Sequence, residues 1–261
     1  MKVAIITGST RGIGLATAQK LAQEGYAVVI NGRNIDRVEE VVQDIQNGGG
    51  KACGVAGEIQ KEETCEKLVK KAVDTFGRVD ILINNAGIVH DRISYKMSID
   101  EWDEVINVHL RGAFLCTKSV VNEMIKQQTE GTIINMISTA GLEGVIGQVN
   151  YSAAKAGLLG MTLTLAKELK KKNIRVIAIA PAALTDMTKP YVENAKKEAE
   201  RKGTDLDSYW KIGTAEDIAK FIYQLLKHNT LKYTGEIFQV NGQKIYRWLP
   251  PKRIEEPFSF N

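Results

Sequence analysis

Residues 1–25 restrict the possible folds of the chain more than any other stretch. An apolar run at 3–6 is followed by Gly8, Gly12 and Gly14, and then by apolar residues at helical spacing as far as Ala22. This order predicts a strand, a glycine turn and a helix. Gly8 permits a tight turn, Gly12 lets the backbone approach a pyrophosphate, and Gly14 allows the helix to pack closely. Because a helix N-terminus attracts anions, the segment predicts a phosphate-binding turn.

A second informative segment, STAGLEGVIGQVNYSAAK, lies at 138–155. Tyr151 and Lys155 are four residues apart, so on a helix both side chains stand on one face. A phenol with an ordinary pKa near ~10 is a weak acid at neutral pH, and a nearby ammonium should lower that pKa. Ser138 follows an apolar run at 132–137, which places its hydroxyl at the carboxyl end of a predicted strand. We expect these three residues to form a catalytic group; the plainer alternative is an exposed helix with an incidental tyrosine–lysine pair.

Taken together and in order, these motifs resemble the short-chain dehydrogenase/reductase family. The matching segments are TGSTRGIG at 7–14, NNAG at 84–87, Ser138, and Tyr151-x-x-x-Lys155. The resemblance implies one Rossmann-type NAD(P)-binding oxidoreductase domain over residues 1–261. Its expected fold is α/β, with a doubly wound parallel sheet of about seven strands in the order 3-2-1-4-5-6-7 and helices on both faces. It also implies a homodimer or homotetramer that acts on a carbonyl/alcohol pair.

Composition agrees with a single domain and excludes other classes of protein. With 261 residues, of which 44% are hydrophobic, the chain can bury one large core. The 35 basic and 31 acidic residues are spread along the chain, so we expect no nucleic-acid partner. Three cysteines without metal-ligand spacing predict reduced thiols and no metal site. No signal peptide or long apolar run precedes the first strand, so we expect a cytoplasmic protein without a membrane partner.

The segment at 26–34 predicts a second strand that leaves into a turn. The residue just after this strand bears on the choice of cofactor. A carboxylate there would bind the ribose 2′-hydroxyl and repel a 2′-phosphate, but this chain has Gly32 and then Arg33. Arg33 can pair with a phosphate, and Arg11 in the glycine turn adds a second guanidinium. We therefore expect NADPH rather than NADH. The alternative for Arg33 is a solvated charge at the start of the next helix.

The family resemblance extends the expected cofactor site to other strand ends. The strand at 51–59 should end against the adenine, where this chain has Glu58 and Ile59 in place of the family's Asp-Val. The apolar strand at 79–87 should be central in the sheet and end beside the cofactor. The complete set of expected cofactor contacts is Gly8, Thr10, Arg11, Gly12, Ile13, Gly14, Arg33, Glu58, Ile59, Asn85, Ala86, Gly87, Tyr151, Lys155, Leu184 and Thr185.

A departure from the family pattern occurs in the helix predicted over 99–127. The segment VINVHLRGAF aligns with the family's V-N-L-x-G-x-F and puts His109 at the position of a fourth catalytic residue, an asparagine. Asn107 cannot replace it, because two residues along a helix turn a side chain by about 200°. With an ordinary pKa near ~6.5, His109 could hold the water that the asparagine holds, or carry the proton itself. The alternative is a buried histidine that only fills space.

The C-terminal third should supply the substrate side of the site. Pro181 is expected to break its strand. Polar and apolar residues at helical spacing suggest a substrate loop or lid over 187–212, although a solvated helix explains its mixed charges equally well. Thr214 and Asp217 predict the start of the last helix. The aromatic tail at 243–261 predicts a subunit interface through Tyr246, Trp248 and Phe258.

The resemblance is to 3-oxoacyl-[acyl-carrier-protein] reductases in particular, carried by NNAGIVHDR, NYSAAKAGLLG and TDM. It implies NADPH-dependent reduction of a ketone, a 3-oxoacyl thioester of a carrier protein or of CoA, with Tyr151 as proton donor, in fatty acid metabolism. His109 suggests a rival, the oxidation of a (3R)-hydroxyacyl-CoA or another secondary alcohol. A third possibility is a catalytically silent dinucleotide-binding scaffold, but Ser138, Tyr151 and Lys155 argue against it.

Overall fold

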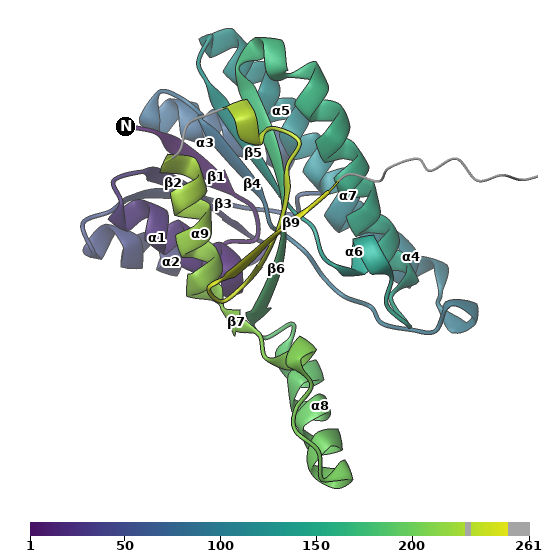
Figure 1. The fold of residues 1–261 in the computed structure, drawn as a ribbon. Helices are drawn as coiled ribbons and strands as arrows, with labels where there is room; N and C mark the ends of the chain where they lie inside the picture. Colours follow the sequence, from purple (N-terminus) through teal and green to yellow (C-terminus); the bar gives the residue numbers. More distant parts are fainter. Residues whose placement is uncertain (228–230, 250–261) are drawn as a thin grey trace, which may run out of the picture.

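Strands and helices alternate along the chain in the computed structural model, which describes residues 1–227 and 231–249 (Figure 1). The strands are β1 (Val3–Ile6), β2 (Ala27–Gly32), β3 (Lys51–Ala56), β4 (Ile81–Asn84), β5 (Gly131–Met136), β6 (Ile174–Leu184), β7 (Gly213–Thr214), β8 (Ile237–Asn241) and β9 (Lys244–Trp248). The helices are α1 (Gly12–Gln23), α2 (Ile35–Asn47), α3 (Glu62–Phe76), α4 (Ile99–Ile106), α5 (Gly112–Gln127), α6 (Ala140–Glu143), α7 (Val149–Glu168), α8 (Lys189–Lys202) and α9 (Ala215–Lys227).

The central sheet has the order β3-β2-β1-β4-β5-β6-β8-β9, with the short β7 paired to β6. Its strands are parallel except β9, which is antiparallel to β8. The expected fold class and the order 3-2-1-4-5-6-7 are therefore confirmed, with β8 as the seventh long strand. The sheet does not end at β8, because β9 pairs with its free edge. Gly242, at φ +57°, closes a tight turn that brings residues 244–248 back against β8.

Helices cover both faces of the sheet and enclose two layers of apolar core. Side chains of α1, α2 and α9 pack on one face, and those of α3, α5 and α7 pack on the other (Figure 1). Strands buried on both faces are mostly apolar, which is why β1 reads as a continuous hydrophobic run and why β2 and β5 contain the apolar runs 27–30 and 133–134. Because β1 pairs with β4 and β4 pairs with β5 in parallel, the carboxyl ends of these three strands lie side by side at one edge of the sheet.

The glycine turn is shaped by contacts that leave no room for side chains. Gly8 has φ +62°, and a Cβ there would lie 2.7 Å from the Cα of Ala86. A Cβ on Gly14 would lie 2.4 Å from the carbonyl oxygen of Gly8, so α1 starts directly on the turn. Asn31 braces the turn from β2, because its side chain accepts from the N–H of Gly8 and donates to the carbonyl of Gly57.

The helix predicted over 99–127 is not continuous. A π-helical turn at Asn107–Arg111 separates α4 from α5, and His109 is buried within it. Such turns insert a residue into the helical ladder and often occur at functional sites. The periodicity of the side chains cannot reveal this insertion, because the apolar residues on either side keep their helical spacing.

Pro181 does not break its strand, contrary to expectation, because β6 continues to Leu184 and pairs with β8 through this residue. The N–H of Ala178 donates toward β8, whereas the carbonyl of Ile179 accepts from Ile137 on the β5 side. Position 181 has the orientation of Ile179, and β5 has already ended there. The missing N–H of proline therefore removes no bond from the ladder.

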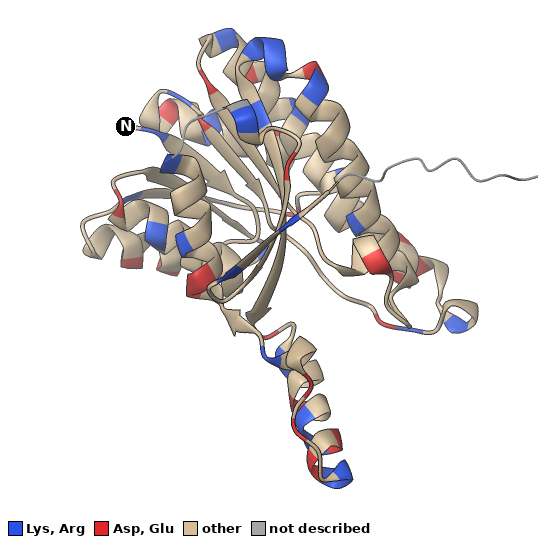
Figure 2. Cartoon of the chain, viewed as in Figure 1, with Lys and Arg blue, Asp and Glu red and all other residues tan. Residues whose placement is uncertain are grey.

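The expected lid region contains α8, which projects from the body of the molecule (Figure 1). Positive and negative residues are mixed along it, as they are over the rest of the chain (Figure 2). At the start of α9, the hydroxyl of Thr214 accepts from the N–H of Asp217, whose carboxylate accepts in return from the N–H of Thr214, as predicted. No helix among residues 1–227 and 231–249 is long and apolar enough to cross a membrane.

Trp248, which we expected at a subunit interface, packs within its own chain. It lies on β9 against the apolar cluster of Leu158 and Ile237, and its indole N–H donates to the side chain of Gln239 at 2.9 Å. Tyr246 is half exposed and lines a cavity described below. Phe258 lies outside the described residues.

Candidate active site

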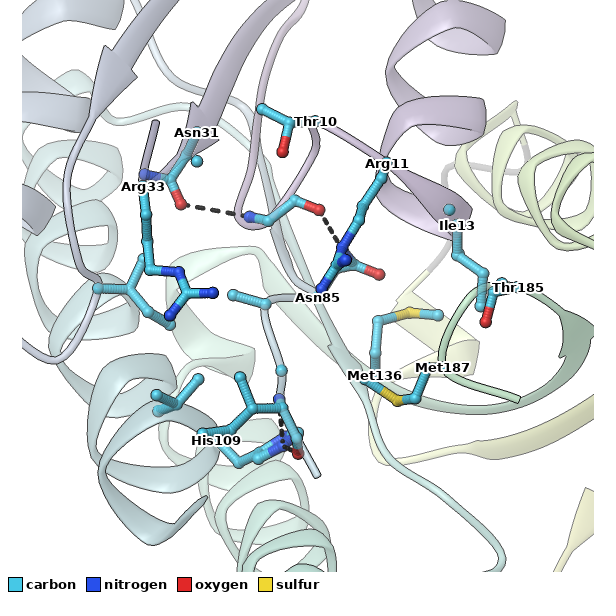
Figure 3. Close-up of a pocket in the computed structure, with 18 of the residues that line it drawn as sticks. Thr10, Arg11, Ile13, Asn31, Arg33, Asn85, His109, Met136, Thr185 and Met187 are labelled. Atoms are coloured by element: carbon cyan, nitrogen blue, oxygen red, sulfur yellow. Dashed lines mark hydrogen bonds between the residues drawn. The ribbon is translucent and has the colours of Figure 1, made fainter. Parts of the chain in front are cut away.

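A cleft of about 410 Å³ opens where the strands end at their carboxyl side (Figure 3). Most of the expected cofactor residues line it: Gly8, Thr10, Arg11, Gly12, Ile13, Arg33, Glu58, Ile59, Asn85, Ala86, Gly87, Tyr151, Lys155 and Thr185. Thr185 lies directly against the glycine turn, because a Cβ on Gly12 would be 3.6 Å from its methyl group. The topology thus brings together residues that are up to 177 positions apart, from 8 to 185.

Two of the expected contacts do not line this cleft. Gly14 is buried under the turn, where its role is the close packing described above. Leu184 is 50% exposed and lines neither this cleft nor the larger cavity beside it, so its expected contact has no support in the structure. Because β6 continues as far as Leu184 rather than breaking at Pro181, Thr185 takes the place beside the glycine turn.

Several lining residues were not foreseen from the sequence. Arg37 brings a third guanidinium to the cleft besides Arg11 and Arg33, although it is paired with Glu40 at 2.5 Å. Arg37 lies in the first turn of α2, where its N–H donates to the side chain of the N-cap Asn34, so the capping position just after Arg33 could have identified it. Other unforeseen lining residues are Asn31, Asn34, Gly57, Gln60, Ile88, Val108, Met136, Ile137 and Pro181.

The Asn84-Asn85 pair braces the strands beside the cleft. The amide of Asn84 donates to Thr117 at 3.0 Å and to Asn135 at 2.9 Å. The amide of Asn85 donates to the carbonyls of Thr7 and Gly8, both at 3.0 Å. The first residue thus ties β4 to β5 and α5, while the second fixes the glycine turn against the end of β4.

Tyr151 and Lys155 lie in the first two turns of α7 with their side chains together. The Nζ of Lys155 is 5.4 Å from the ring centroid of Tyr151 and donates to the carbonyl of Met136 at 2.5 Å. Lys155 is only 4% exposed, whereas Tyr151 is partly exposed. The Nζ of Lys155 is thus anchored at the end of β5 and lies beside the Tyr151 ring.

A second cavity, of about 1010 Å³, adjoins the first, and Tyr151 lines both. Ser138 lines only this second cavity, where its Oγ accepts from the N–H of Ala140 at 3.2 Å. The residues of the predicted lid, including Tyr191 and Trp210, form the opposite wall. The tyrosine phenol thus stands at the junction between the first cleft and a larger second cavity.

The ionisation of this pair differs from the expectation. Burial raises the pKa of Tyr151 to about 12, and a hydrogen bond with Ser138 opposes this rise. Burial also lowers the pKa of Lys155 to about 7. As the pH rises, Lys155 loses its proton well before the phenol of Tyr151 does. The lysine charge therefore does not lower the pKa of Tyr151 in the chain alone. The expectation that a nearby ammonium lowers this pKa was wrong. At neutral pH the phenol carries its proton.

The lowered pKa of Lys155 gives a prediction for stability. An unfolded lysine keeps its proton up to about pH 10.4, so between pH 7 and about 10 the unfolded state binds more protons than the folded state. In that window the free energy of unfolding should rise with pH through this group. The urea midpoint of the wild type should therefore exceed that of Lys155→Met by a larger margin at about pH 9.5 than at about pH 6.5. Parallel midpoints for both proteins would contradict the assignment.

His109 lies beside this pair in a neutral state. Its ring meets the Tyr151 ring edge to face, with centroids 5.1 Å apart. Burial is the main cause, and the charge of Lys155 the second, of a pKa of His109 that is lowered to about 3. The imidazole of His109 is therefore uncharged at neutral pH. Its Nε2 is bound to the backbone of Ile88, while its Nδ1 is buried without a hydrogen-bond partner among the described residues. This nitrogen is available to hold one polar group.

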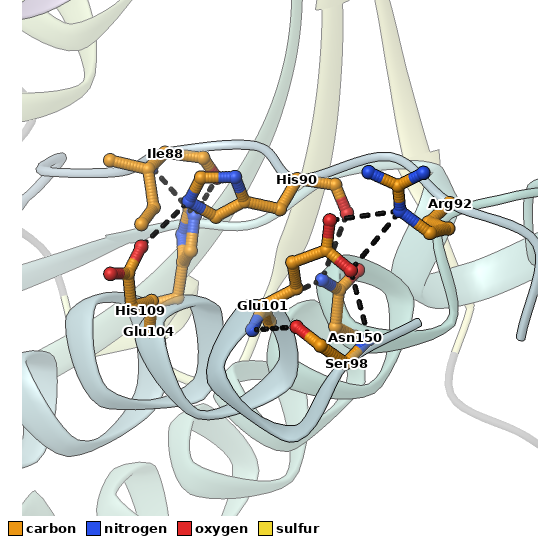
Figure 4. A network of polar contacts seen from close by, with 8 residues as sticks. All are labelled: Ile88, His90, Arg92, Ser98, Glu101, Glu104, His109 and Asn150. Atoms are coloured by element: carbon orange, nitrogen blue, oxygen red, sulfur yellow. Dashed lines mark hydrogen bonds and ion pairs between the residues drawn. The ribbon is translucent and has the colours of Figure 1, made fainter. Parts of the chain in front are cut away.

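A polar network fixes the start of α7 relative to the loop after β4 (Figure 4). The amide of Asn150 donates to the carbonyls of His90 and Glu101, both at 3.0 Å. Its carbonyl oxygen accepts from the N–H of Tyr151 at 2.7 Å. Glu101 also pairs with Arg92 and completes the capping box of α4 with Ser98. The loop, α4 and the catalytic helix are therefore held as one unit around Tyr151.

Comparison with known proteins identifies the family. A family model described as short chain dehydrogenase matches residues 2–196. The chain belongs to this family. Short-chain dehydrogenases are NAD(P)-dependent oxidoreductases, and the cleft at the ends of β1 and β4 fits that cofactor class.

Similar proteins in this family include reductases from bacteria. The 3-oxoacyl-[acyl-carrier-protein] reductase of Aquifex aeolicus is 41% identical over 243 residues, which are 92% of this chain and 96% of that protein. The corresponding reductase of Synechocystis is also 41% identical, over 92% of this chain and 96% of its own. The crystal structure of a short chain dehydrogenase from Mycobacterium avium superposes with a TM-score of 0.82 at 32% identity, covering 100% of this chain and 90% of that one.

Proposed function

We propose that the chain reduces the ketone of a 3-oxoacyl thioester to the 3-hydroxy compound with NADPH. The observation that carries this proposal is the position of Tyr151 at the junction of the two cavities. The similar reductases of Aquifex aeolicus and Synechocystis act on 3-oxoacyl groups carried by a protein, which supports a thioester substrate.

The residues of the first cleft fit a phosphorylated dinucleotide. The N-terminus of α1 and the positive-φ backbone of Gly8 and Gly12 form an anion-binding turn of the kind used for pyrophosphates. Arg11 and Arg33 would hold a 2′-phosphate, and Lys155 the ribose hydroxyls. When bound, the cofactor supplies hydride to the carbonyl carbon.

The protonation state of Tyr151 fits a proton donor for ketone reduction. With its pKa raised to about 12, the phenol holds a proton that it can give to the substrate oxygen as hydride reaches the carbon. Ser138 stands on the substrate side and can donate its hydroxyl hydrogen to the same oxygen. In the reverse reaction, the oxidation of a hydroxyacyl substrate, the same tyrosine would act as phenolate and accept the proton. His109, neutral and buried, would hold a water or a substrate group rather than carry a proton.

The choice of NADPH over NADH depends on Arg33. This exposed guanidinium lines the cleft and acts electrostatically on Glu58 across it. We expect Arg33→Ala to lower kcat/KM for NADPH by about tenfold and to leave the value for NADH within about twofold, because only NADPH has the 2′-phosphate. Arg37→Ala serves as the matched control and should have a smaller effect, since Glu40 already neutralises Arg37. An equal loss with both cofactors would show that Arg33 does not read the phosphate.

The reaction itself is tested by following NADPH oxidation with a panel of 3-oxoacyl-CoA chain lengths, beginning with acetoacetyl-CoA. We expect turnover that depends on chain length, because the second cavity is lined by aromatic and aliphatic side chains. Tight NADPH binding without turnover of any ketone would instead support the scaffold alternative. We also propose that the protein forms a homodimer or homotetramer in the cytoplasm, as the family resemblance implies. Gel filtration with light scattering would measure the size of this oligomer.

A further inference from the structure

The wall of the second cavity is joined by hydrogen bonds at one carboxylate. Asp91 follows β4, and its Oδ2 accepts from the hydroxyl of Tyr191 on α8 at 2.6 Å. The same oxygen accepts from the side-chain amide of Gln148, just before α7, at 2.9 Å. All three residues line the cavity that contains Ser138 and Tyr151. Three segments far apart in the sequence thus fix the position of one acidic group.

This carboxylate is a charge without a cationic partner. Asp91 takes part in none of the ion pairs formed by residues 1–227 and 231–249, and both groups that bind it are neutral donors. An ionised carboxylate accepts hydrogen bonds only, which matches two donors on one oxygen. The adjacent Arg92 is paired with Glu101 instead. The negative charge therefore lies at the cavity wall without a salt-bridge partner among the described residues, although Lys211 and Lys244 line the same cavity.

The charge acts at the reacting end of the cavity. The charged side chains that line this cavity are Asp91, Lys211 and Lys244. Among them, Asp91 is the one whose charge raises the pKa of the Tyr151 phenol. The oxygen of a bound ketone must lie next to that phenol for the proton to pass. A substrate group attached close to the ketone is therefore within the electrostatic reach of Asp91.

We propose that Asp91 is a specificity-determining residue, which disfavours substrates with an anionic group close to the ketone and so directs the site to esters and thioesters rather than free 3-oxo acids. The inference rests on the proposed function and adds a reason why the acyl group has to be esterified. Repulsion between the substrate carboxylate and Asp91 is absent when the same carbon skeleton carries a neutral ester. The hydrogen bonds from Tyr191 and Gln148 keep the charge in place.

The test compares two probes that differ in charge at the same skeleton, ethyl acetoacetate and acetoacetate, with NADPH. We expect wild type to prefer the ester, and Asp91→Asn to reduce the ester-to-acid ratio of kcat/KM by at least about fivefold. Such a change corresponds to about 1 kcal/mol, the size expected for two unit charges about 4 Å apart that are screened as in bulk water. Asp91→Glu keeps the charge and should keep most of the preference. Any effect of Asp91 on the pKa of Tyr151 cancels in the ratio, because both probes use the same phenol.

Tyr191→Phe is the matched control, since it removes the hydrogen bond and leaves the charge. It should change kcat/KM for both probes by a similar factor and preserve most of the ratio, because the amide of Gln148 still holds the carboxylate. Wild type should also lose part of its preference between low salt and about 0.5 M salt, because Asp91 is exposed to solvent. Ester turnover with an unchanged ratio in Asp91→Asn would overturn the inference and leave the proposed function standing. No turnover of either probe by wild type, despite NADPH binding, would overturn both.

Discussion

Tyr151→Phe should lose about 10³-fold of the ketone-reductase turnover, within the range for a general acid, while NADPH affinity stays within about twofold. The variant keeps the ring that packs against His109 and Lys155 and removes only the hydroxyl. Because that hydroxyl is the group placed between the two cavities, the loss should fall on turnover and not on cofactor binding. NADPH fluorescence titration and steady-state NADPH oxidation measure the two quantities separately.

Tyr95→Phe provides the control for this experiment. Tyr95 is 81% exposed and lines neither cavity, so its hydroxyl should make no difference to turnover or binding. If Tyr151→Phe instead kept more than about a tenth of wild-type turnover, another group would have to supply the proton, and the role of Tyr151 would be lost.

Lys155→Met should weaken NADPH binding and lower turnover together, with a combined loss in kcat/KM of at least about 10²-fold. The lysine is buried on the cofactor side of Tyr151, where its Nζ is fixed by the carbonyl of Met136. Methionine fills a similar volume without the charge or the donors. The variant therefore differs from Tyr151→Phe, in which binding is retained.

The same substitution at Lys167 is the matched control, because Lys167 lies on the exposed face of the last turn of α7. Lys167→Met should behave as wild type in both assays. A Lys155→Met variant with unchanged NADPH affinity would exclude the proposed contact with the ribose and limit Lys155 to a role in catalysis or packing.

Much of the scaffold could be predicted from local patterns. The glycine turn follows from apolar periodicity and from the small residues that a close approach requires, whereas the strand order followed from the family resemblance. Ser138, Tyr151 and Lys155 also follow, since strand ends in a parallel sheet share one edge and positions four apart share one helix face. The NNAG motif was likewise visible in the sequence, but the bracing role of Asn84 is known only from its tertiary contacts.

Other features depend on contacts that are distant in the sequence. The bond between Asp91 and Tyr191 joins residues 100 positions apart, and no local pattern predicts it. The pKa of Lys155 depends on how deeply the folded chain buries its Nζ, so an argument from spacing alone misjudged its effect on Tyr151. The π-helical turn around His109 and the added strand β9 were missed because their backbone geometry is set by packing and by one glycine turn.

The most direct measurement of the central claim is a crystal structure of the wild-type chain with NADP⁺ and a 3-oxoacyl thioester. We expect the phenol oxygen of Tyr151 to lie within about 3.2 Å of the ketone oxygen, with the acyl group in the second cavity. A ketone bound out of reach of Tyr151, with a different proton donor at that distance, would contradict the account.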